Sequence, residues 1–533
     1  MSVVKTPAVE IFSRNALQQI PQLLTLQDRN PHSPTYGCFD RNFWQYRLVD
    51  FPTGMAQEFV YPLALAYSTK LPDNPYFGDQ AICEWVKAGI NFAEKSSHSD
   101  GSCDDFYPYE RAAGAAAFSL FGCLEAYHLL QIKDAQLEKF FTRRGRWLAK
   151  HPESGKLSNH EALIVYCLYL LSQRFEGSVF APDYRERLDR LLSWQHKEGW
   201  FVEYNGCDLG YQTLTISMLA QLYDESREEG LREPLERAIA MTAQFMHPDG
   251  SFGGEYGSRN TYNYFPHGFE IAGKWLPEAL ELNDRFAIAL QSGRAPCYLD
   301  DHMIAHHMWS YLLAARYYTS TRNEKGFVRK KRAFYEGAGL LVDRRDEMDL
   351  YVALNKGGSF KLFRRGEFVA SDTQISLKMR DGSTAVCHHI DDYAIDVGAD
   401  YIEIAGNAGW AKQKLMLPLD NILLRTFMLT IGRFFPGFVR RLLQQILITY
   451  KRIAPFQFSR RFEWEGGELI VSDCIGAEKW DDVISAGVGG HQTSISVVQS
   501  RPYHPSQHQP WLDITKKTQN LKSGQALRIK RKY

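Results

Sequence analysis

The sequence lacks the features that mark secreted, membrane-spanning and nucleic-acid-binding proteins. Nine cysteines are scattered singly and no CxxC pair occurs, which argues against a zinc ribbon and a disulfide framework. The N-terminus shows no signal-peptide pattern, and no run of about 18 uncharged apolar residues is present. Basic and acidic residues both number 62, so nucleic acid would meet no basic surplus. We therefore expect a protein of the reducing cytoplasm that binds no nucleic acid.

The sequence does contain a large apolar fraction and many aromatic side chains. Hydrophobic residues make up 44% of the 533 residues, which is enough for a large core. The 28 Tyr, 32 Phe and 11 Trp have two interpretations. They fill the core, which composition alone favours, or they line a cleft in which ligand rings stack.

Hydrophobic periodicity divides the chain into two parts. Up to about residue 330, apolar residues recur at helical spacing in segments too long for strands, namely 112–130, 161–175, 213–223 and 303–318. From about residue 340 the period changes to two, with hairpin turns at Arg380-Asp381-Gly382 and Glu465-Gly466-Gly467. Helices followed by strands predict a helical domain over 1–335 and an antiparallel β-sheet domain over 336–533.

Polar or aromatic residues recur about every 50 residues near the expected helix starts of the first domain. They are Glu58, Glu110, His160, Tyr211, Tyr262 and His302. A helical hairpin fits this period, and six hairpins make a closed ring of inner and outer helices. Because all inner helices of such a ring start at the same end, the six residues would gather at one mouth. The sequence thus predicts an (α/α)6 toroid, complete or incomplete, followed by an antiparallel β-sandwich.

Asn159 and His160 open one expected inner helix. We expect Ser158 and Glu161 to form a capping box there, which leaves Asn159 and His160 without a structural role. The helix dipole disfavours an imidazolium in the first turn, so His160 would stay neutral and accept a proton. The Asn159 amide can donate two hydrogen bonds to a carboxylate. The alternative is a surface pair at a helix start.

Tyr211 lies in the first turn of the next inner helix, with Asp208 as its expected N-cap. Tyr211 would then share the mouth with His160. A tyrosine has an ordinary pKa of about 10, so acid–base work near neutral pH needs help from cationic neighbours. The alternative is a Tyr211 that packs against the loop around Trp200.

The least generic stretch is 247–267, which is rich in glycine, aromatic and hydrogen-bonding residues. Such a loop contributes little to a core and suits a binding surface. An arginine can grip a carboxylate with two hydrogen bonds, and tyrosines can stack on rings. We expect these substrate-binding residues in it: Arg259, Asn260, Tyr262, Tyr264 and His267.

Further polar residues complete the predicted mouth. His302 and His306 share one helical face, as two metal ligands would, but no third ligand is evident. His302 and Glu110 are therefore assigned to substrate binding, and His388 joins them from the strand half. The other carboxylates expected at the mouth, any two of which a hydrolase could use, are Asp104, Asp105, Glu203 and Asp208. GxSxG, P-loop and dinucleotide-binding motifs are absent, so neither a cofactor nor a metal is predicted.

The segment 418–452 is apolar with interspersed basic residues, and Pro436-Gly437 interrupts it. Against the single acidic residue Asp420 stand Arg425, Arg433, Arg440, Arg441, Lys451 and Arg452. A bent amphipathic element of this kind can lie on an anionic membrane surface. The other interpretation, which we favour at this point, is an insertion that packs against the ring with its basic residues in solvent.

In combination these features resemble the heparinase II/III-like and alginate-lyase-like polysaccharide lyases. The resemblance rests on a helical ring before a β-sandwich, on Asn159-His160, and on Glu203 and Tyr211 about 50 residues later. The stretch 38–46 and the following Asp50-Phe51-Pro52 also look like relatives encoded with bacterial surface-polysaccharide assembly genes.

The resemblance implies β-elimination beside a uronate carboxylate. By this resemblance Asn159 neutralises the carboxylate, and His160 and Tyr211 share the base and acid roles, with Tyr211 donating the proton to the leaving oxygen. The family usually adds a histidine from the sheet domain, for which His388 or His389 could serve. The sequence departs from the family in showing no export signal and no recognisable metal cluster in the sheet domain.

Three hypotheses follow. The first is a lyase that cleaves a uronate-containing, acidic glycan. The second is a glycoside hydrolase on the same ring, which needs two facing carboxylates. The third is a non-catalytic factor of surface-polysaccharide assembly, associated with glycan or membrane. We expect the protein in the cytoplasm or peripherally at the inner membrane through 418–452, and the sequence does not indicate its oligomeric state.

Overall fold

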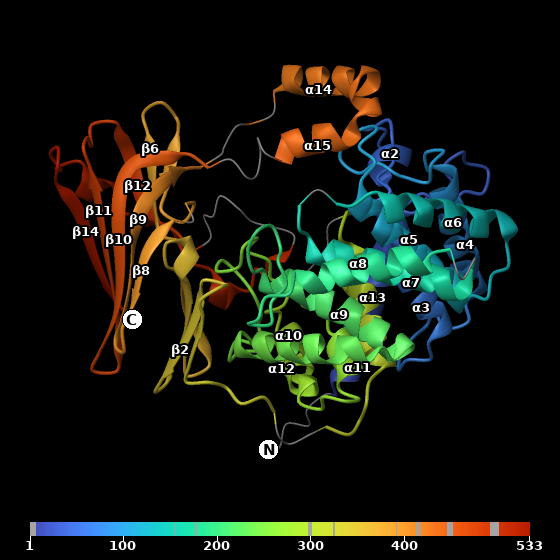
Figure 1. The fold of residues 1–533 in the computed structure, drawn as a ribbon, viewed down its shortest axis with the longest axis horizontal. Coiled ribbons are helices and arrows are strands. Elements are labelled where there is room, and N and C mark those ends of the chain that lie inside the picture. The colour runs from blue at the N-terminus through green and yellow to red at the C-terminus, as the bar shows by residue number, and fades with distance from the viewer. Residues whose placement is uncertain are drawn as a thin grey trace.

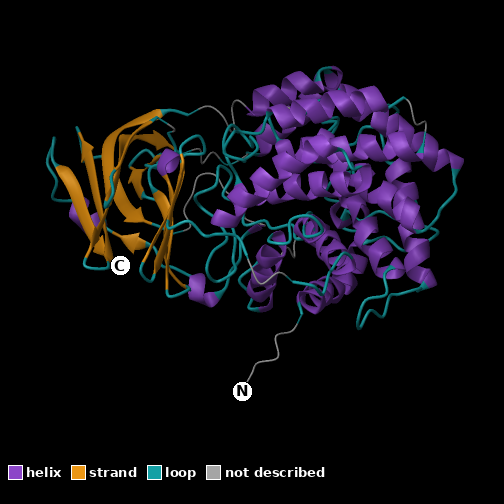
Figure 2. Cartoon of the chain, turned by 60° about the horizontal axis from the view of Figure 1, so that its bottom comes forward, coloured by secondary structure: helices purple, strands orange, loops and turns teal. Residues whose placement is uncertain are grey.

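The computed structural model describes residues 7–153, 155–175, 179–296, 301–322, 326–390, 392–411, 415, 417–444, 451–490 and 500–533. Helices fill the first part of the chain and strands the second (Figures 1 and 2). The last helix before the strands ends at Arg316, and the first strand begins at Arg332. The predicted order of helices and strands is confirmed, and so is the predicted fold class.

Six inner helices form a closed ring. Each contacts the next in chain order, and the last contacts the first. Their bounds are α3 (Val60–Ser68), α5 (Ala113–Leu129), α7 (Ser158–Arg174), α9 (Leu209–Ser226), α11 (His267–Ala272) and α13 (Ile304–Arg316). These helices are apolar almost all round, as in α5 and α7, because both of their faces are covered by protein.

Six outer helices surround this ring in the described part of the chain, each packed on one or two inner helices. They are α1 (Ala8–Leu26), α4 (Gln80–Lys95), α6 (Ala135–Lys150), α8 (Ala181–Ser193), α10 (Arg232–Gln244) and α12 (Ala279–Gln291). Helix α1 packs on α13, so the start of the chain completes the outer ring. The six predicted hairpins are therefore present. Each of the six recurring residues lies within five positions of the start of an inner helix.

Short helices fill the connections between these elements. Those of the first part are α2 (Arg41–Trp44), η1 (Met55–Phe59) and η2 (Glu229–Leu231), and those of the second are η3 (Leu354–Lys356), η7 (Pro505–Gln507) and α16 (Thr515–Thr518).

The second part holds two antiparallel sheets. The first is a five-stranded meander of β1 (Arg332–Tyr335), β2 (Leu340–Arg345), β3 (Met348–Ala353), β4 (Ser359–Arg364) and β5 (Glu367–Asp372). The second runs in the order β13-β12-β6-β7-β9-β10-β11-β14, with β8 on β9. Its strands are β6 (Ile375–Met379), β7 (Thr384–Val386), β8 (Tyr393–Val397), β9 (Tyr401–Trp410), β10 (Ile453–Glu465), β11 (Glu468–Ala477), β12 (Val483–Val488), β13 (Leu512–Asp513) and β14 (Ala526–Lys532).

The first sheet links the ring to the second sheet. One of its faces joins the core of the toroid through residues such as Tyr351 and Phe363, whose rings lie against His247. Its other face packs on the second sheet, with Phe360 against Phe462. The sheets are thus fixed to the end of the toroid by a continuous apolar core.

An insertion between β9 and β10 leaves the sheets and lies over the toroid (Figure 1). It consists of α14 (Pro418–Thr430), η4 (Gly432–Phe434) and α15 (Pro436–Gln444). Met428 and Val439 of the insertion are buried, and its Arg425 forms an ion pair with Asp50 of the toroid. The predicted bend at Pro436-Gly437 is present; residues 445–450 of the predicted segment lie outside the described part of the chain.

Candidate active site

His160 is held by a carboxylate from the preceding loop. Its Nδ1 lies 3.3 Å from Oε2 of Glu153, which also accepts a hydrogen bond of 2.9 Å from the backbone N–H of Gly114. The ring meets Phe118 edge-on, and its side chain is 21% exposed. The imidazole is thus partly exposed, while Nδ1 is engaged.

The ionisation of His160 differs from the prediction. Burial lowers its pKa, but the hydrogen bond and negative charge of Glu153, together with the charge of Glu203, raise it by more, so the net shift is upward from 6.5. Two carboxylates therefore outweigh burial and the helix dipole, and the pKa shifts in the direction opposite to the predicted one.

Helix α7 is capped by Glu203, which lies on a loop 44 residues further along the chain. Its Oε2 accepts hydrogen bonds from Oγ of Ser158 at 3.1 Å and from the backbone N–H of Asn159 at 3.2 Å. The predicted capping box is wrong, because Glu161 instead forms a buried ion pair of 2.8 Å with Arg187. Burial raises the pKa of Glu203 to about 7, although the nearby Asn159 and His160 act in the opposite direction.

Asn159 is buried in the first turn of α7. Its side-chain amide interacts with the carboxylate of Glu203 and lowers the pKa of that group, although neither polar atom of the amide meets the full geometric criteria for a hydrogen bond in the described part of the chain. Buried polar groups are nearly always paired, and Glu203 is the neighbour that this amide faces.

Tyr211 lies in the first turn of α9, the neighbour of α7 in the ring. Asp208 is the N-cap as predicted, and its Oδ1 accepts a hydrogen bond of 3.1 Å from the backbone N–H of Tyr211. Burial and the neighbouring Tyr204 raise the pKa of Tyr211 well above 10, against the opposing charge of Arg259. The hydroxyl therefore keeps its proton near neutral pH, which suits a proton donor.

Arg259 is held beside Tyr211 by two features. Its backbone N–H donates a hydrogen bond of 2.8 Å to Asp208, and its guanidinium lies 4.2 Å from the ring centre of Tyr204. Arg259 is thus a cation near Tyr211, but burial and Tyr204 outweigh its charge, so the pKa of Tyr211 is raised and not lowered as predicted.

Glu110 lies in the loop before α5. Its carboxylate accepts hydrogen bonds from the backbone N–H groups of Phe106 at 2.7 Å and Asp105 at 3.3 Å. Burial, together with the charge of Asp105, raises its pKa to about 7. His302 is near the same loop, with Nε2 3.9 Å from Oδ1 of Asp105 and its ring against Phe106.

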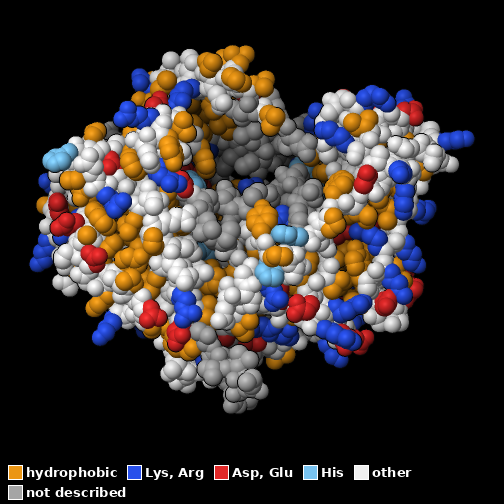
Figure 3. All heavy atoms as spheres, turned by 180° about the vertical axis from the view of Figure 1, so that it is seen from behind, with side chains coloured by type: hydrophobic (Ala, Val, Ile, Leu, Met, Phe, Trp, Pro, Cys, Tyr) orange, Lys and Arg blue, Asp and Glu red, His pale blue; other side chains and the backbone are white. Residues whose placement is uncertain are grey.

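Arg440 of the insertion reaches into this mouth. Its Nη1 donates to Oε1 of Glu153 at 2.8 Å, and its Nη2 donates to the carbonyl oxygens of Glu110 and Arg111 at 3.1 and 2.8 Å. In the view from behind, the surface is hollowed between the insertion and the two lobes of the molecule (Figure 3).

Four predicted binding residues from the loop 247–267 lie away from this mouth. Tyr264 and His267 are fully buried, where they bond to Asn283 and Ser310 and help to fill the core. Asn260 and Tyr262 are buried too, as partners of Lys356 and Glu255. The polar atoms that suggested binding are instead used inside the protein: Asn260 bonds to Lys356 beside the first sheet, Tyr262 bonds within the loop, and Tyr264 and His267 bond to α12 and α13. These contacts do not favour a substrate-binding role for the four residues.

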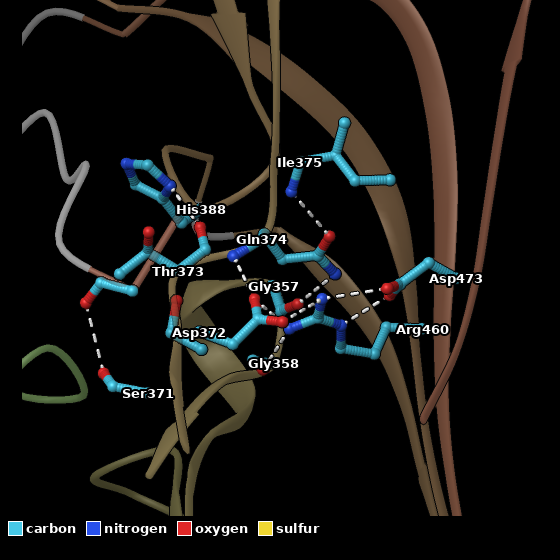
Figure 4. Close-up of polar contacts among 12 residues, drawn as sticks. Gly357, Gly358, Ser371, Asp372, Thr373, Gln374, Ile375, His388, Arg460 and Asp473 are labelled. Carbon is cyan, nitrogen blue, oxygen red and sulfur yellow. Dashed lines mark hydrogen bonds and ion pairs between the residues drawn. The ribbon is translucent and has the colours of Figure 1, made fainter. Parts of the chain in front are cut away.

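His388 is buried between the two sheets rather than in a cleft. Its Nδ1 lies 2.8 Å from the carbonyl oxygen of Thr373, next to the ion pairs of Arg460 with Asp372 and Asp473 (Figure 4). Burial, with the charge of Lys356, lowers its pKa to about 3. These contacts give the imidazole a structural role and do not favour the predicted substrate contact.

His306 is also structural. Its Nδ1 lies 2.9 Å from Oε2 of the fully buried Glu58, whose other oxygen accepts the Nε1–H of Trp309. Among the residues that the structure describes, no group of three or more His, Cys, Asp or Glu side chains is arranged to hold a metal ion.

Two functional residues were missed by sequence reasoning, Glu153 and Arg440. Glu153 lies in a polar loop with no motif, and Arg440 was counted only as one charge of the insertion. No local pattern connects two residues 287 positions apart. The available signal was an Arg440-Arg441 pair within a short helix that is otherwise mostly apolar.

Comparison with known proteins identifies the fold. No family model matches the sequence, and no curated protein matches it. A Paenibacillus xanthan lyase structure is similar over 91% of this chain at 12% identity with a TM-score of 0.53. This chain spans about half of that lyase, 47% of its length.

Two glucuronyl hydrolases are less similar in structure. One, specific for heparin, matches 58% of this chain and 96% of its own at 10% identity with a TM-score of 0.40. Another, from Streptococcus agalactiae, matches 60% of this chain and 82% of its own at 10% identity with a TM-score of 0.35. The likeness to the xanthan lyase shows that this chain has the fold of a helical toroid followed by β-sheets.

Proposed function

We propose that this protein is a carbon–oxygen lyase that cleaves a uronate-containing glycan by β-elimination. The observation that carries the proposal is that Asn159 and His160 lie in the first turn of α7 and Tyr211 lies in the first turn of the adjacent inner helix α9. The three side chains combine an amide, a base and a protonated hydroxyl. The fold shared with a xanthan lyase supports this choice of chemistry.

In the proposed reaction the Asn159 amide donates hydrogen bonds to the uronate carboxylate. This stabilises the negative charge that develops when the C5–H bond breaks. His160 takes the C5 proton, and the electron pair forms the C4–C5 double bond. The C4–O bond then breaks, and Tyr211 gives its proton to the leaving oxygen. Water is not consumed, and one chain end carries the new double bond.

An acidic substrate fits the charges around these residues. Arg259 lies beside Tyr211, and Arg440 lies beside Glu153. Both guanidiniums would attract a polyanionic chain to the mouth.

Glycoside hydrolysis is the second candidate, favoured by two carboxylic acids with a pKa of about 7, Glu110 and Glu203. Such a value suits a general acid. Glu203, however, caps α7, and Glu110 holds a loop through two backbone N–H groups. Both carboxylates thus have structural partners, which is why we place the lyase first.

We also propose that the insertion contacts an anionic membrane surface, with the protein peripheral to the cytoplasmic face. Its outer side presents Leu419, Ile422, Leu423, Phe427, Leu429, Ile431, Phe434, Phe435, Phe438 and Leu442, which are 39% to 66% exposed. Hydrophobic side chains gather at the top of Figure 3, over this insertion. So large an apolar face next to several arginines is typical of interfacial helices. No helix in the described part of the chain is long and apolar enough to cross a membrane.

Vesicle sedimentation tests the membrane contact. Wild-type protein should sediment with phosphatidylcholine vesicles that contain phosphatidylglycerol, and less with phosphatidylcholine alone. The double variant Ile422→Ser/Phe438→Ser should bind about tenfold more weakly, while Val328→Ser, an exposed apolar residue elsewhere, should not. Equal sedimentation of both variants, or a dimer held together by this face, would exclude the contact.

A spectrophotometric assay tests the activity. Purified protein is mixed with a panel of uronate polymers and oligosaccharides, and the ultraviolet absorbance of the new double bond is followed. We expect a rise with at least one substrate that is lost in both His160→Ala and Tyr211→Phe. A flat trace together with release of reducing sugar would favour the hydrolase.

A further inference from the structure

The insertion of the β-domain contributes a buried guanidinium to the site of the toroid. Arg440 lies on α15, and only 14% of its side chain is exposed. Its partners all belong to the toroid: the carboxylate of Glu153 and the carbonyl oxygens of Glu110 and Arg111. A charged group is rarely buried this far unless it is paired and hydrogen-bonded, as it is here.

Glu153 distributes its two carboxylate oxygens between the domains. Oε1 accepts from Arg440, while Oε2 accepts from the N–H of Gly114 and faces Nδ1 of His160. Since an ionised carboxylate only accepts, Nδ1 carries the proton and Nε2 is left to take a proton from a substrate.

The position of the imidazole is fixed closely. A Cβ at Gly114 would lie 2.7 Å from Cε1 of His160 and 2.8 Å from its Nδ1, so the ring packs directly on the backbone of α5. A small displacement of Glu153 would therefore change the direction in which His160 presents Nε2.

We propose that Arg440 is a positioning residue of this site: it holds the Glu153 carboxylate so that His160 is kept in one tautomer and one orientation. The insertion is then a part of the active site and not only a surface element. The proposal rests on the function proposed above for His160, but the contacts that carry it do not.

Arg440 also influences the pKa of His160 through its charge. Glu153 from the preceding loop and Glu203 from the loop before α9 favour the protonated ring, whereas Arg440 from α15 opposes it. Phe118 of α5 adds no charge. Arg440 thus limits how basic His160 becomes, and its loss should leave the ring protonated at higher pH.

Nuclear magnetic resonance on full-length protein with labelled histidine tests the proposal without any substrate. The signal of His160 is assigned by its loss in His160→Gln. In Arg440→Gln the titration of His160 should move up by roughly half to one pH unit, and the preference for the proton on Nδ1 should weaken. Arg440→Lys, which keeps the charge but loses the fork, should restore the titration and only part of the tautomer preference.

Two further variants make the outcome specific. Arg425→Gln removes a different ion pair of the insertion without touching Glu153, and should leave His160 unchanged. In a Glu153→Gln background, Arg440→Gln should shift the His160 titration much less than in wild type, because the link between them is gone. Equal titration and tautomer in Arg440→Gln and Arg425→Gln would overturn the proposal.

The activity arm separates this proposal from the proposed function. If the protein is a lyase, the acidic limb of kcat/KM against pH should move with the His160 titration in Arg440→Gln, and kcat at pH 7 should fall about three- to tenfold. If no substrate is cleaved, the proposed function fails while the resonance experiment still decides the role of Arg440.

Discussion

Nδ1 of His160 lies 3.3 Å from Oε2 of Glu153. Glu153 precedes the start of α7, and His160 lies in its first turn. This pair makes the imidazole more basic than a free histidine and leaves Nε2 as the nitrogen that does not face Glu153. It is the feature that turns a helix start into a site for proton removal.

The pH dependence of cleavage should follow this pair. Because His160 must be neutral to accept a proton and its pKa is raised, kcat/KM should climb with pH and level off only above 6.5. Tyr211 keeps its proton because its pKa is well above 10, so it should cause no loss of rate below pH 10. A pH–rate profile checks both limbs, and an acidic limb centred below pH 6 would contradict the assignment of His160 as base.

Replacement of Asn159 should affect catalysis more than binding. Asn159→Ala removes the amide that stabilises charge on the substrate carboxylate, so kcat should fall roughly 100- to 1000-fold with a smaller change in KM. Asn159→Asp, of nearly the same shape, should be at least as damaging because it places a negative charge there. Steady-state kinetics of both variants measure this; near-normal kcat in Asn159→Asp would exclude the role.

Glu203 should make the protein less stable as the pH rises. Its folded pKa of about 7 is above the unfolded value of about 4.5, so the folded state binds the proton more tightly and loses stability as pH increases through this window. The carbonyl of Gln can still cap α7. The free energy of unfolding of Glu203→Gln, relative to that of wild type, should therefore increase by roughly 2–3 kcal/mol between pH 4.5 and 8. Urea unfolding at both pH values tests this, and a gap that does not grow with pH would contradict it.

The ion pairs between the sheets should stabilise the protein with a pH dependence opposite to that of Glu203: their contribution is lost as the pH falls. Burial raises the pKa of Asp372, but the charges of Arg460 and Arg531 lower it by more, so that the net pKa is about 2. The contribution is present above the ordinary value of 3.8 and is lost as pH falls towards 2. Asp372→Asn should cost roughly 3–5 kcal/mol at pH 7, because Arg460 is fully buried (Figure 4).

A matched control is Asp482→Asn, which removes the acidic partner of the exposed Arg380. Its midpoint of urea unfolding should stay near that of wild type. If both substitutions lower the midpoint equally, the buried cluster is not the source of the effect.

The ring was predictable from the sequence because its signal is repeated. Six inner helices each need an apolar segment and a polar start, so a period of about 50 residues survives individual irregularities. The change to a period of two likewise identified the sheets. Asp208 and Tyr211 were placed correctly, because an N-cap and a first turn are fixed by local sequence.

The rest of the site depends on contacts between distant parts of the chain. The sequence predicted that Glu161 forms half of a capping box. In the structure Glu161 forms an ion pair with the buried Arg187, and Glu203 caps α7 instead. The loop 247–267 looked like a binding surface because it is polar and aromatic. In the structure those groups satisfy one another in the interior, as Tyr264 does with Asn283. Polarity alone does not distinguish a polar group that binds a ligand from one that is paired inside the protein.

The central claim, β-elimination at Asn159, His160 and Tyr211, is tested most directly by the products formed in water labelled with heavy oxygen. The fragments from the most reactive acidic glycan are analysed by mass spectrometry. Elimination consumes no water, so we predict fragments without the label, one of which is lighter than a hydrolysis product by one water. Incorporation of one heavy oxygen at each cleaved bond would contradict the lyase and establish a hydrolase.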